Sequence, residues 1–273
     1  MSTVTFVVDV SNHNTGLTLR SVLSQGYEAC YAKATEGANF KDALFHGYAN
    51  QATALGMLFA PYHFLHSDSA ISAQVENYLS QVHDKRLPGI LDVEPVYQGS
   101  KLVSAPGLKH AEAFRAMVER HGYTMPTVYY SREWWTQTGK PNLTGWHVIN
   151  AAYPNSAHEY GSVLWQQVQN DGGFNPYGGK APDLWQFTGN GKITGYPGPV
   201  DMNVFPGTRS ALAALGVFHD YRPSVPAVAG QGTGKGTTGP DTPPSPSPTL
   251  SEQLYKLARA TAFVAGEVKS HGL

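Results

Sequence analysis

Two acidic residues stand two positions apart in the apolar segment GILDVEP (residues 89–95). In an extended strand, side chains alternate between faces, so Asp92 and Glu94 face the same way with Cα atoms about 6.6 Å apart. Two neighbouring buried carboxyl groups are costly to ionise together, so we expect the pKa of one to rise. A protonated carboxyl beside an ionised one is what cleavage of a glycosidic bond requires. The simpler interpretation is a solvated strand end, or ion pairs with Lys33 or Arg132.

Two further acids lie in other apolar runs. Asp9 is in VVDVS (residues 7–11), and Asp201 is in PVDMN (residues 199–203). If the predicted strands close into a barrel, the first and last strands are neighbours, and these two carboxyl groups lie side by side at the rim. Each acid alone is as readily a loop or helix-capping residue. Together the four acids predict one catalytic site: Glu94, Asp92, Asp9 and Asp201.

Polar and aromatic side chains near the same rim fit a saccharide. Sugar rings stack their apolar C–H faces on aromatic planes, and their hydroxyl groups take hydrogen bonds. For each aromatic residue, packing in the core is the alternative. The predicted substrate-binding residues are Lys33, Glu36, Tyr62, Tyr130, Tyr153, Trp185 and Gln186.

The elements that must position these residues alternate along the chain. Helical patterns over residues 18–25, 42–55, 71–82 and 108–120 separate the first five of eight predicted strands, and such alternation predicts a parallel α/β sheet with crossover helices. Polar residues at the strand ends favour a TIM-like barrel, whose site lies at the carboxyl ends of the strands; an open doubly wound sheet is the alternative. We expect irregular loops between the last three strands. The predicted strands are residues 4–10, 29–35, 57–65, 89–93, 127–131, 147–153, 184–188 and 200–205.

Composition excludes several classes of protein. The net charge is −1 and only 14% of the 273 residues are charged, so we expect no nucleic-acid partner and no basic membrane-binding surface. No apolar run is long enough to insert into a membrane. The single cysteine, Cys30, is predicted to be a small core residue. His63 and His66 would face opposite sides of a strand, and we expect no metal and no cofactor.

The chain is predicted to divide into three parts. Residues 1–222 form the barrel, and the Pro/Gly/Ser/Thr-rich residues 223–249 form a flexible linker. Residues 250–273 form one short amphipathic helix, which either docks on the barrel or mediates self-association or a partner contact. The first residues lack a basic region followed by an apolar run, so we expect no signal peptide and synthesis in the cytoplasm.

A set of motifs, in order on successive predicted strands, resembles the lysozymes (N-acetylmuramidases) of glycoside hydrolase family 25. The resemblance implies a modified TIM-like barrel of eight strands and about five helices. It also implies hydrolysis of the β-1,4 bond from N-acetylmuramic acid to N-acetylglucosamine in bacterial peptidoglycan. The motifs are VDVSNHN (8–14), YAKATEG (31–37), PYHF (61–64), ILDVEP (90–95), VYYS (128–131), LWQFT (184–188) and PVDMNVF (199–205).

The resemblance also implies roles for single residues. Glu94 matches the general acid of the family, Asp92 matches the carboxylate that stabilises the reacting centre, and Asp9 and Asp201 match the flanking acids. Lys33, Tyr62, Tyr130 and Trp185 match positions that line the saccharide groove.

The mechanism and biological setting stay open at this point. Either the 2-acetamido oxygen of the substrate or a water molecule attacks the reacting carbon. We expect a bacteriophage endolysin that acts on the host cell wall after release at lysis, or else a bacterial enzyme exported by another route. The alternatives in function are a catalytically silent saccharide-binding barrel and a chitinase-like glycosidase.

Overall fold

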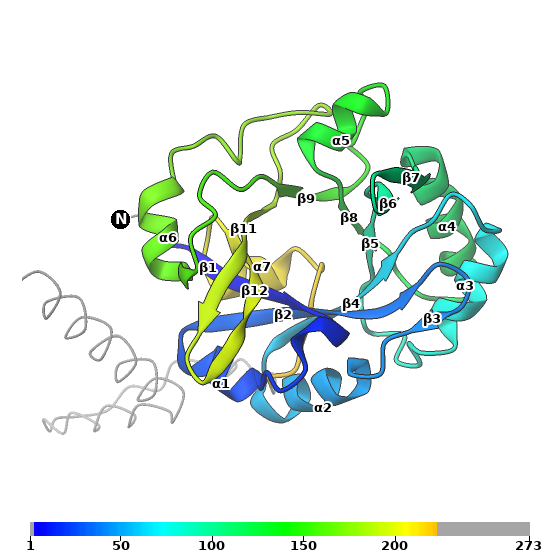
Figure 1. Ribbon diagram of the computed structural model, residues 1–273. Helices are drawn as coiled ribbons and strands as arrows, with labels where there is room; N and C mark the ends of the chain where they lie inside the picture. The colour runs from blue at the N-terminus through cyan, green and yellow to red at the C-terminus, as the bar shows by residue number, and fades with distance from the viewer. Residues whose placement is uncertain (1–2, 223–273) are drawn as a thin grey trace, which may run out of the picture. The chain divides into compact units, whose positions relative to one another are not determined.

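Eight strands close into a barrel in the computed structural model, which describes residues 3–222 (Figure 1). Strand β12 pairs with β1, which confirms the predicted barrel and excludes the open sheet. All eight predicted strands are present, with boundaries that differ by a few residues. In order around the barrel they are β1 (Thr5–Val10), β2 (Tyr27–Glu36), β4 (Leu58–Phe64), β5 (Ile90–Asp92), β8 (Thr127–Tyr129), β9 (His147–Ala151), β11 (Leu184–Ile193) and β12 (Tyr196–Phe205).

The barrel is not entirely parallel. Strand β12 runs antiparallel to both neighbours, β11 and β1, while the other pairs around the barrel are parallel. A tight hairpin joins β11 to β12, and its turn contains Gly195, whose φ of 80° suits glycine. The expectation of an irregular loop here was wrong. The reversal has a consequence for the site, because it carries Asp201 to the end of the barrel where β1 finishes at Val10.

Seven α-helices occur in the described residues, instead of about five. Four of them occupy the predicted helical stretches: α1 (Leu19–Ser24), α2 (Phe45–Leu55), α3 (Ile71–Leu79) and α4 (Leu108–Arg120). Two short helices were not predicted: α5 (Arg132–Gln137), between β8 and β9, and α6 (Gly161–Val168), between β9 and β11, where an irregular loop was expected. Helix α7 (Arg209–Ala214) follows β12. The smaller elements are η1 (Asn12–Asn14), β3 (Phe40–Lys41), β6 (Val96–Gln98), β7 (Lys101–Ser104), β10 (Glu159–Tyr160) and β13 (His219–Asp220).

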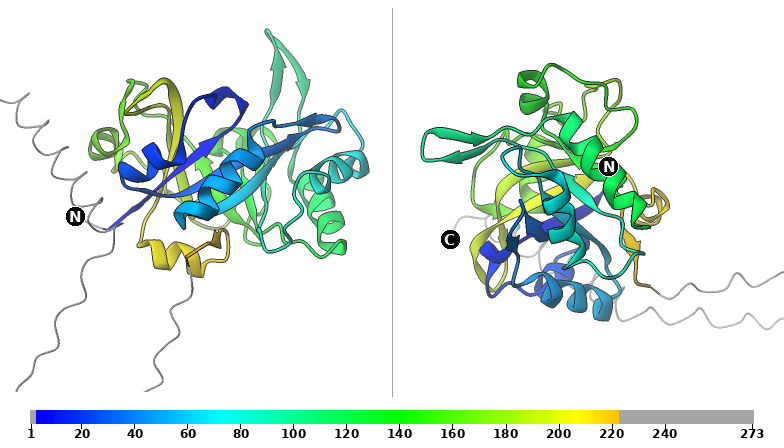
Figure 2. Two further views of the ribbon diagram at one scale, coloured as in Figure 1. Left: turned by 90° about the horizontal axis from the view of Figure 1, so that it is seen from below. Right: turned by 90° about the vertical axis from the view of Figure 1, so that its right-hand side faces the viewer.

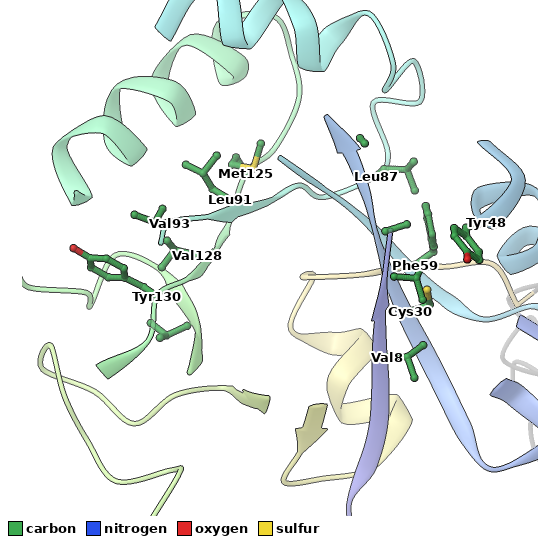
Figure 3. Close-up of a cluster of buried hydrophobic side chains, with 14 of the residues drawn as sticks. Val8, Cys30, Tyr48, Phe59, Leu87, Leu91, Val93, Met125, Val128 and Tyr130 are labelled. Atoms are coloured by element: carbon green, nitrogen blue, oxygen red, sulfur yellow. The ribbon is translucent and has the colours of Figure 1, made fainter. Parts of the chain in front are cut away.

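Side-chain alternation along the strands divides the core into two layers. Outward-facing residues, among them Leu91, Val93 and Val128, pack between the barrel and its helices (Figure 3). Inward-facing residues such as Val7 and Ile90 fill the barrel interior and continue into α7, Val217 and Phe218. Helix α7 lies at one end of the barrel, and the β6–β7 hairpin stands out from the other (Figure 2, left). The apolar end is therefore closed by α7, and the polar site lies at the opposite end.

The remaining predictions concern the C-terminal part of the chain, membrane insertion and metal binding. The predicted linker, residues 223–249, and the predicted helix, residues 250–273, lie outside the described residues, so both stay predictions. Between residues 3 and 222, no helix is long and apolar enough to cross a membrane. Over the same residues, no group of three or more His, Cys, Asp and Glu side chains is arranged to hold a metal ion.

Candidate active site

A cleft of about 270 Å³ opens at the carboxyl end of the parallel strands. All four acids predicted to be catalytic line it, although they come from three different parts of the chain. Of the predicted substrate-binding residues, Lys33, Tyr62, Tyr153 and Gln186 also line it. The other residues of its wall are Ser11, His13, Tyr31, Phe64, Ile90 and Tyr129.

Asp92 and Glu94 share one wall of the cleft because β5 ends between two fixed neighbours. The N–H of Leu65 donates to the carbonyl of Asp92 (2.9 Å), and the N–H of Val93 donates to the carbonyl of Tyr129 (2.9 Å). These bonds extend the strand far enough to turn Val93 outward and both acids inward. Burial raises the pKa of Glu94 to about 7, against the opposing effect of the Lys33 ammonium. Burial and the charge of Glu94 also raise the pKa of Asp92 well above its usual value.

The raised pKa values mean that this pair of acids retains a proton near neutral pH. Two adjacent carboxyl groups titrate as a unit, and the repulsion between their charges opposes loss of the last proton. The spacing predicted a raised pKa for one of the two carboxyl groups, and burial raises the pKa of both.

Asp9 and Asp201 form the second acidic pair. They lie directly opposite each other in the register of β1 and β12, as expected for neighbouring strands of a closed barrel. Oδ2 of Asp9 accepts hydrogen bonds from Nε2 of Gln186 (2.8 Å) and from Nδ2 of Asn203 (2.7 Å). Burial raises the pKa of Asp9, and these two amides act in the opposite direction. Burial and the charge of Asp9 raise the pKa of Asp201 well above its usual value.

Lys33 is the cation of the cleft. Its ammonium lies 2.7 Å from Glu36 and 4.7 Å from the centre of the Phe64 ring, and 9% of its side chain is exposed. Glu36 was predicted to contact substrate, but it lies outside the cleft lining. It instead holds Lys33 on one side and His66 on the other (3.1 Å), and these bonds lower its pKa to about 2.

Two residues predicted to line the cleft face away from it. Tyr130 is fully buried and its hydroxyl bonds to that of Thr138. Trp185 is also fully buried; its Nε1 donates to the carbonyl of Ala152 (2.8 Å) and its ring packs edge-on against Trp165. Both belong to the layer between barrel and helices, so the prediction that they line the cleft was wrong.

Strand alternation explains these errors and identifies the residues that sequence reasoning missed. Tyr129 is the register partner of Asp92, so it faces inward and Tyr130 outward. Gln186 faces the cleft, which turns its neighbour Trp185 away. Tyr31, the register partner of Asp9, lies two residues before Lys33 on the same strand. The spacing of two from Lys33 could have found Tyr31, whereas Tyr129 is identified only by its register with Asp92.

Comparison with known proteins places the chain in a family. Residues 8–196 match the model of the glycosyl hydrolases family 25. The chain is 30% identical over 218 residues to lysozyme M1 of Streptomyces globisporus, covering 76% of this chain and 70% of that protein. It is 27% identical over 146 residues to an N,O-diacetylmuramidase of Arthroderma benhamiae, covering 50% and 62%.

Solved structures agree with the sequence comparisons. The crystal structure of the bacterial lysozyme from Streptomyces coelicolor aligns with a TM-score of 0.62 and 26% identity, over 78% of this chain and 97% of that one. The catalytic domain of endolysin ply40 from a Listeria monocytogenes bacteriophage shares the fold, with a TM-score of 0.60 and 19% identity over 79% and 98%. From the family match over most of the barrel and this shared architecture, the chain belongs to glycosyl hydrolase family 25.

Proposed function

We propose that Glu94 is the general acid with which this family 25 muramidase cleaves the β-1,4 bond between N-acetylmuramic acid and N-acetylglucosamine in peptidoglycan. The enzyme class follows from the family and from its lysozyme and muramidase relatives. The observation that supports Glu94 is its place in the cleft, buried with a pKa of about 7 beside Asp92. A carboxylic acid with a pKa near the working pH is well matched to proton donation.

In this reaction Glu94 and Asp92 have different tasks. Glu94 protonates the oxygen of the leaving sugar, and Asp92 carries the negative charge that stabilises the positively charged sugar ring of the transition state. Asp9 and Asp201 form the opposite acidic wall of the cleft. Lys33, held by Glu36, opposes the proton affinity of both Asp92 and Glu94.

The two carboxyl groups of Asp92 and Glu94 come from one strand, which favours the 2-acetamido oxygen of the substrate as the internal nucleophile. In that route the sugar carbon bonds to this oxygen as its bond to the leaving sugar breaks, and the leaving oxygen takes the proton of Glu94. Water then opens the ring so formed and returns a proton to Glu94, with net retention of configuration. NMR of the first-formed product distinguishes the two routes. A product with inverted configuration would show direct attack by water.

The assignment of Glu94 is tested by the Glu94→Gln variant, which keeps the shape of the side chain and removes its acidic proton. Release of reducing ends from purified cell walls should fall by several orders of magnitude, with an unchanged far-UV circular dichroism spectrum. Glu112→Gln on α4, an exposed position, is the matched control and should retain full activity. Near-normal hydrolysis by Glu94→Gln would refute the assignment.

The same assay separates the alternatives in substrate and class. Binding to walls without release of reducing ends would indicate a saccharide-binding barrel. Hydrolysis of chitin but not of peptidoglycan would indicate a chitinase-like enzyme. We expect neither, because the cleft retains all four acids and a muramidase relative is among the similar proteins.

We further propose that the enzyme lyses cell walls as a phage endolysin. A phage endolysin domain shares its fold, as do bacterial and fungal lysozymes. An endolysin made in the bacterial cytoplasm should leave the cells intact until chloroform opens the membrane, and culture turbidity should then fall. Lysis without chloroform would contradict this role.

A further inference from the structure

Asp9 accepts hydrogen bonds from two buried side-chain amides. Gln186 and Asn203 both donate to its Oδ2, and both amides are buried, with 3% and 0% exposure. An oxygen that accepts two N–H groups at 2.7 and 2.8 Å makes stronger hydrogen bonds as part of a carboxylate than as part of a neutral carboxylic acid. The two amides therefore favour the ionised form of Asp9.

Tyrosine hydroxyls donate to the opposite end of each amide. Oδ1 of Asn203 accepts from the hydroxyl of Tyr31 (3.0 Å). Oε1 of Gln186 accepts from the hydroxyl of Tyr129 (2.9 Å) and from that of Tyr153. A flipped amide would place its carbonyl oxygen against the carboxylate oxygen of Asp9. The carboxylate of Asp9 thus fixes the orientation of both amides, and the tyrosine hydroxyls donate to the amide oxygens that face away from it.

We propose that Gln186 and Asn203 are positioning residues: they hold Asp9 as the anion of the Asp9–Asp201 pair, and the charge on Asp9 helps the Asp92–Glu94 pair to retain its proton. This role rests on the proposed function of Glu94 as the general acid. Both amides donate to Asp9, so their effect on the Asp92–Glu94 pair passes through the charge of Asp9. Gln186 also lines the cleft, whereas Asn203 does not.

The charges around Asp9 agree with this role. Asp201 hydrogen-bonds to Asp9, and its pKa is raised by burial and by the charge of Asp9, so Asp201 holds the proton of the pair. The charge of Asp9 raises the pKa of Glu94, whereas the Lys33 ammonium lowers it. Loss of the charge on Asp9 leaves the effect of Lys33 less opposed, and Glu94 should then release its proton at lower pH.

The other groups that face Asp9 do not titrate with it in the working range. Burial raises the pKa of Tyr31 and Tyr62, on β2 and β4, and of Tyr153 after β9, so all three stay neutral. Burial also raises the pKa of the Cys30 thiol. Glu36, near the cleft, is ionised because its pKa is about 2. The acids that can change charge together with Asp9 are Asp201, Asp92 and Glu94. His13 and Lys33 are the basic side chains that line the same cleft.

The test is the pH profile of wall hydrolysis by the full chain. Gln186→Met and Asn203→Leu each remove one donor at similar volume. Asp9 then takes up a proton more readily, and the alkaline limb of kcat/KM should move to lower pH, by at most about one unit. Complete loss of a unit charge about 10 Å from a titrating group has this effect at an effective dielectric constant of about 20. Tyr31→Phe removes a hydroxyl that donates to Asn203 (3.0 Å) and also hydrogen-bonds to Asp9, so it should cause a shift in the same direction.

Thr127→Val is the matched control. Thr127 lies on β8, and its buried hydroxyl has no hydrogen-bond partner, so the variant changes polarity inside the same barrel without touching Asp9. Its alkaline limb should match that of the unmodified enzyme. Carboxyl ¹³C NMR titration of Glu94 provides a second readout that does not depend on activity, and its midpoint should fall in both amide variants.

The outcomes separate this proposal from the function on which it rests. An inactive Glu94→Gln variant together with an unshifted limb and an unshifted Glu94 midpoint in both amide variants overturns the positioning role alone. A shift to higher pH also overturns it. Full activity in Glu94→Gln overturns the proposed function, and the positioning role with it.

Discussion

Replacing Glu94 by Gln should stabilise the fold at alkaline pH even though it removes the catalytic acid. The pKa of Glu94 is raised from 4.5 to about 7 by burial. The folded protein therefore binds this proton more tightly than the unfolded chain does, and stability falls as the pH rises from about 4.5 to about 7. Above this range the ionised side chain destabilises the fold; below it, the side chain is protonated in both states and costs nothing.

The size of the effect follows from the same shift. A rise of about 2.5 pH units, taken from 4.5 to about 7, corresponds to about 3 kcal/mol at about 1.4 kcal/mol per unit. The variant also removes the charge that raises the pKa of Asp92, which acts in the same direction. For a domain of this size, about 3 kcal/mol raises Tm by roughly 6–12 °C.

Differential scanning calorimetry at about pH 4 and about pH 8 measures the effect. The Tm of Glu94→Gln should exceed that of the unmodified protein at the higher pH and match it at the lower one. Glu112→Gln, exposed on α4, should change neither value. An equal change in Tm at both pH values, or a lower Tm at about pH 8, would show that burial of an ionised Glu94 is not the cause.

Two further pairs of variants test the packing. Tyr129→Phe removes a donor to Gln186 in the cleft and should lower kcat/KM about tenfold, whereas Tyr130→Phe should leave kcat/KM unchanged and cost about 1 kcal/mol of stability in urea unfolding; equal effects on kcat/KM would contradict the assigned faces. Gly173→Ala should destabilise the fold by about 1–3 kcal/mol, because its Cβ would lie 1.9 Å from the ring of Trp185. Gly47→Ala on α2, where a Cβ meets open space, should instead stabilise it by about 0.5 kcal/mol; a loss of stability there would contradict the packing.

The strands and main helices were predictable because their signal is local. Apolar periodicity depends on which residues must be buried along one segment, and that pattern identified every barrel strand. The β11–β12 hairpin was not predicted because residues 189–199 are rich in Gly and Pro, and these residues are depleted in strands. Pairing between the two strands satisfies their backbone groups despite this composition. The residues of one segment do not show which strand it pairs with, or in which direction. The antiparallel direction of β12 was therefore not predicted.

The sequence by itself determined that Asp92 and Glu94 share a face, since alternation along one strand requires nothing beyond the strand. It also placed Asp9 beside Asp201, given a closed barrel. Only the tertiary structure decided which face of each strand points inward, and hence that Tyr129 and not Tyr130 lines the cleft. The proton affinities of the four acids likewise depend on burial and on charges contributed by separate strands. Desolvation and Coulomb interactions act through space, so their sum exists only once the barrel has closed.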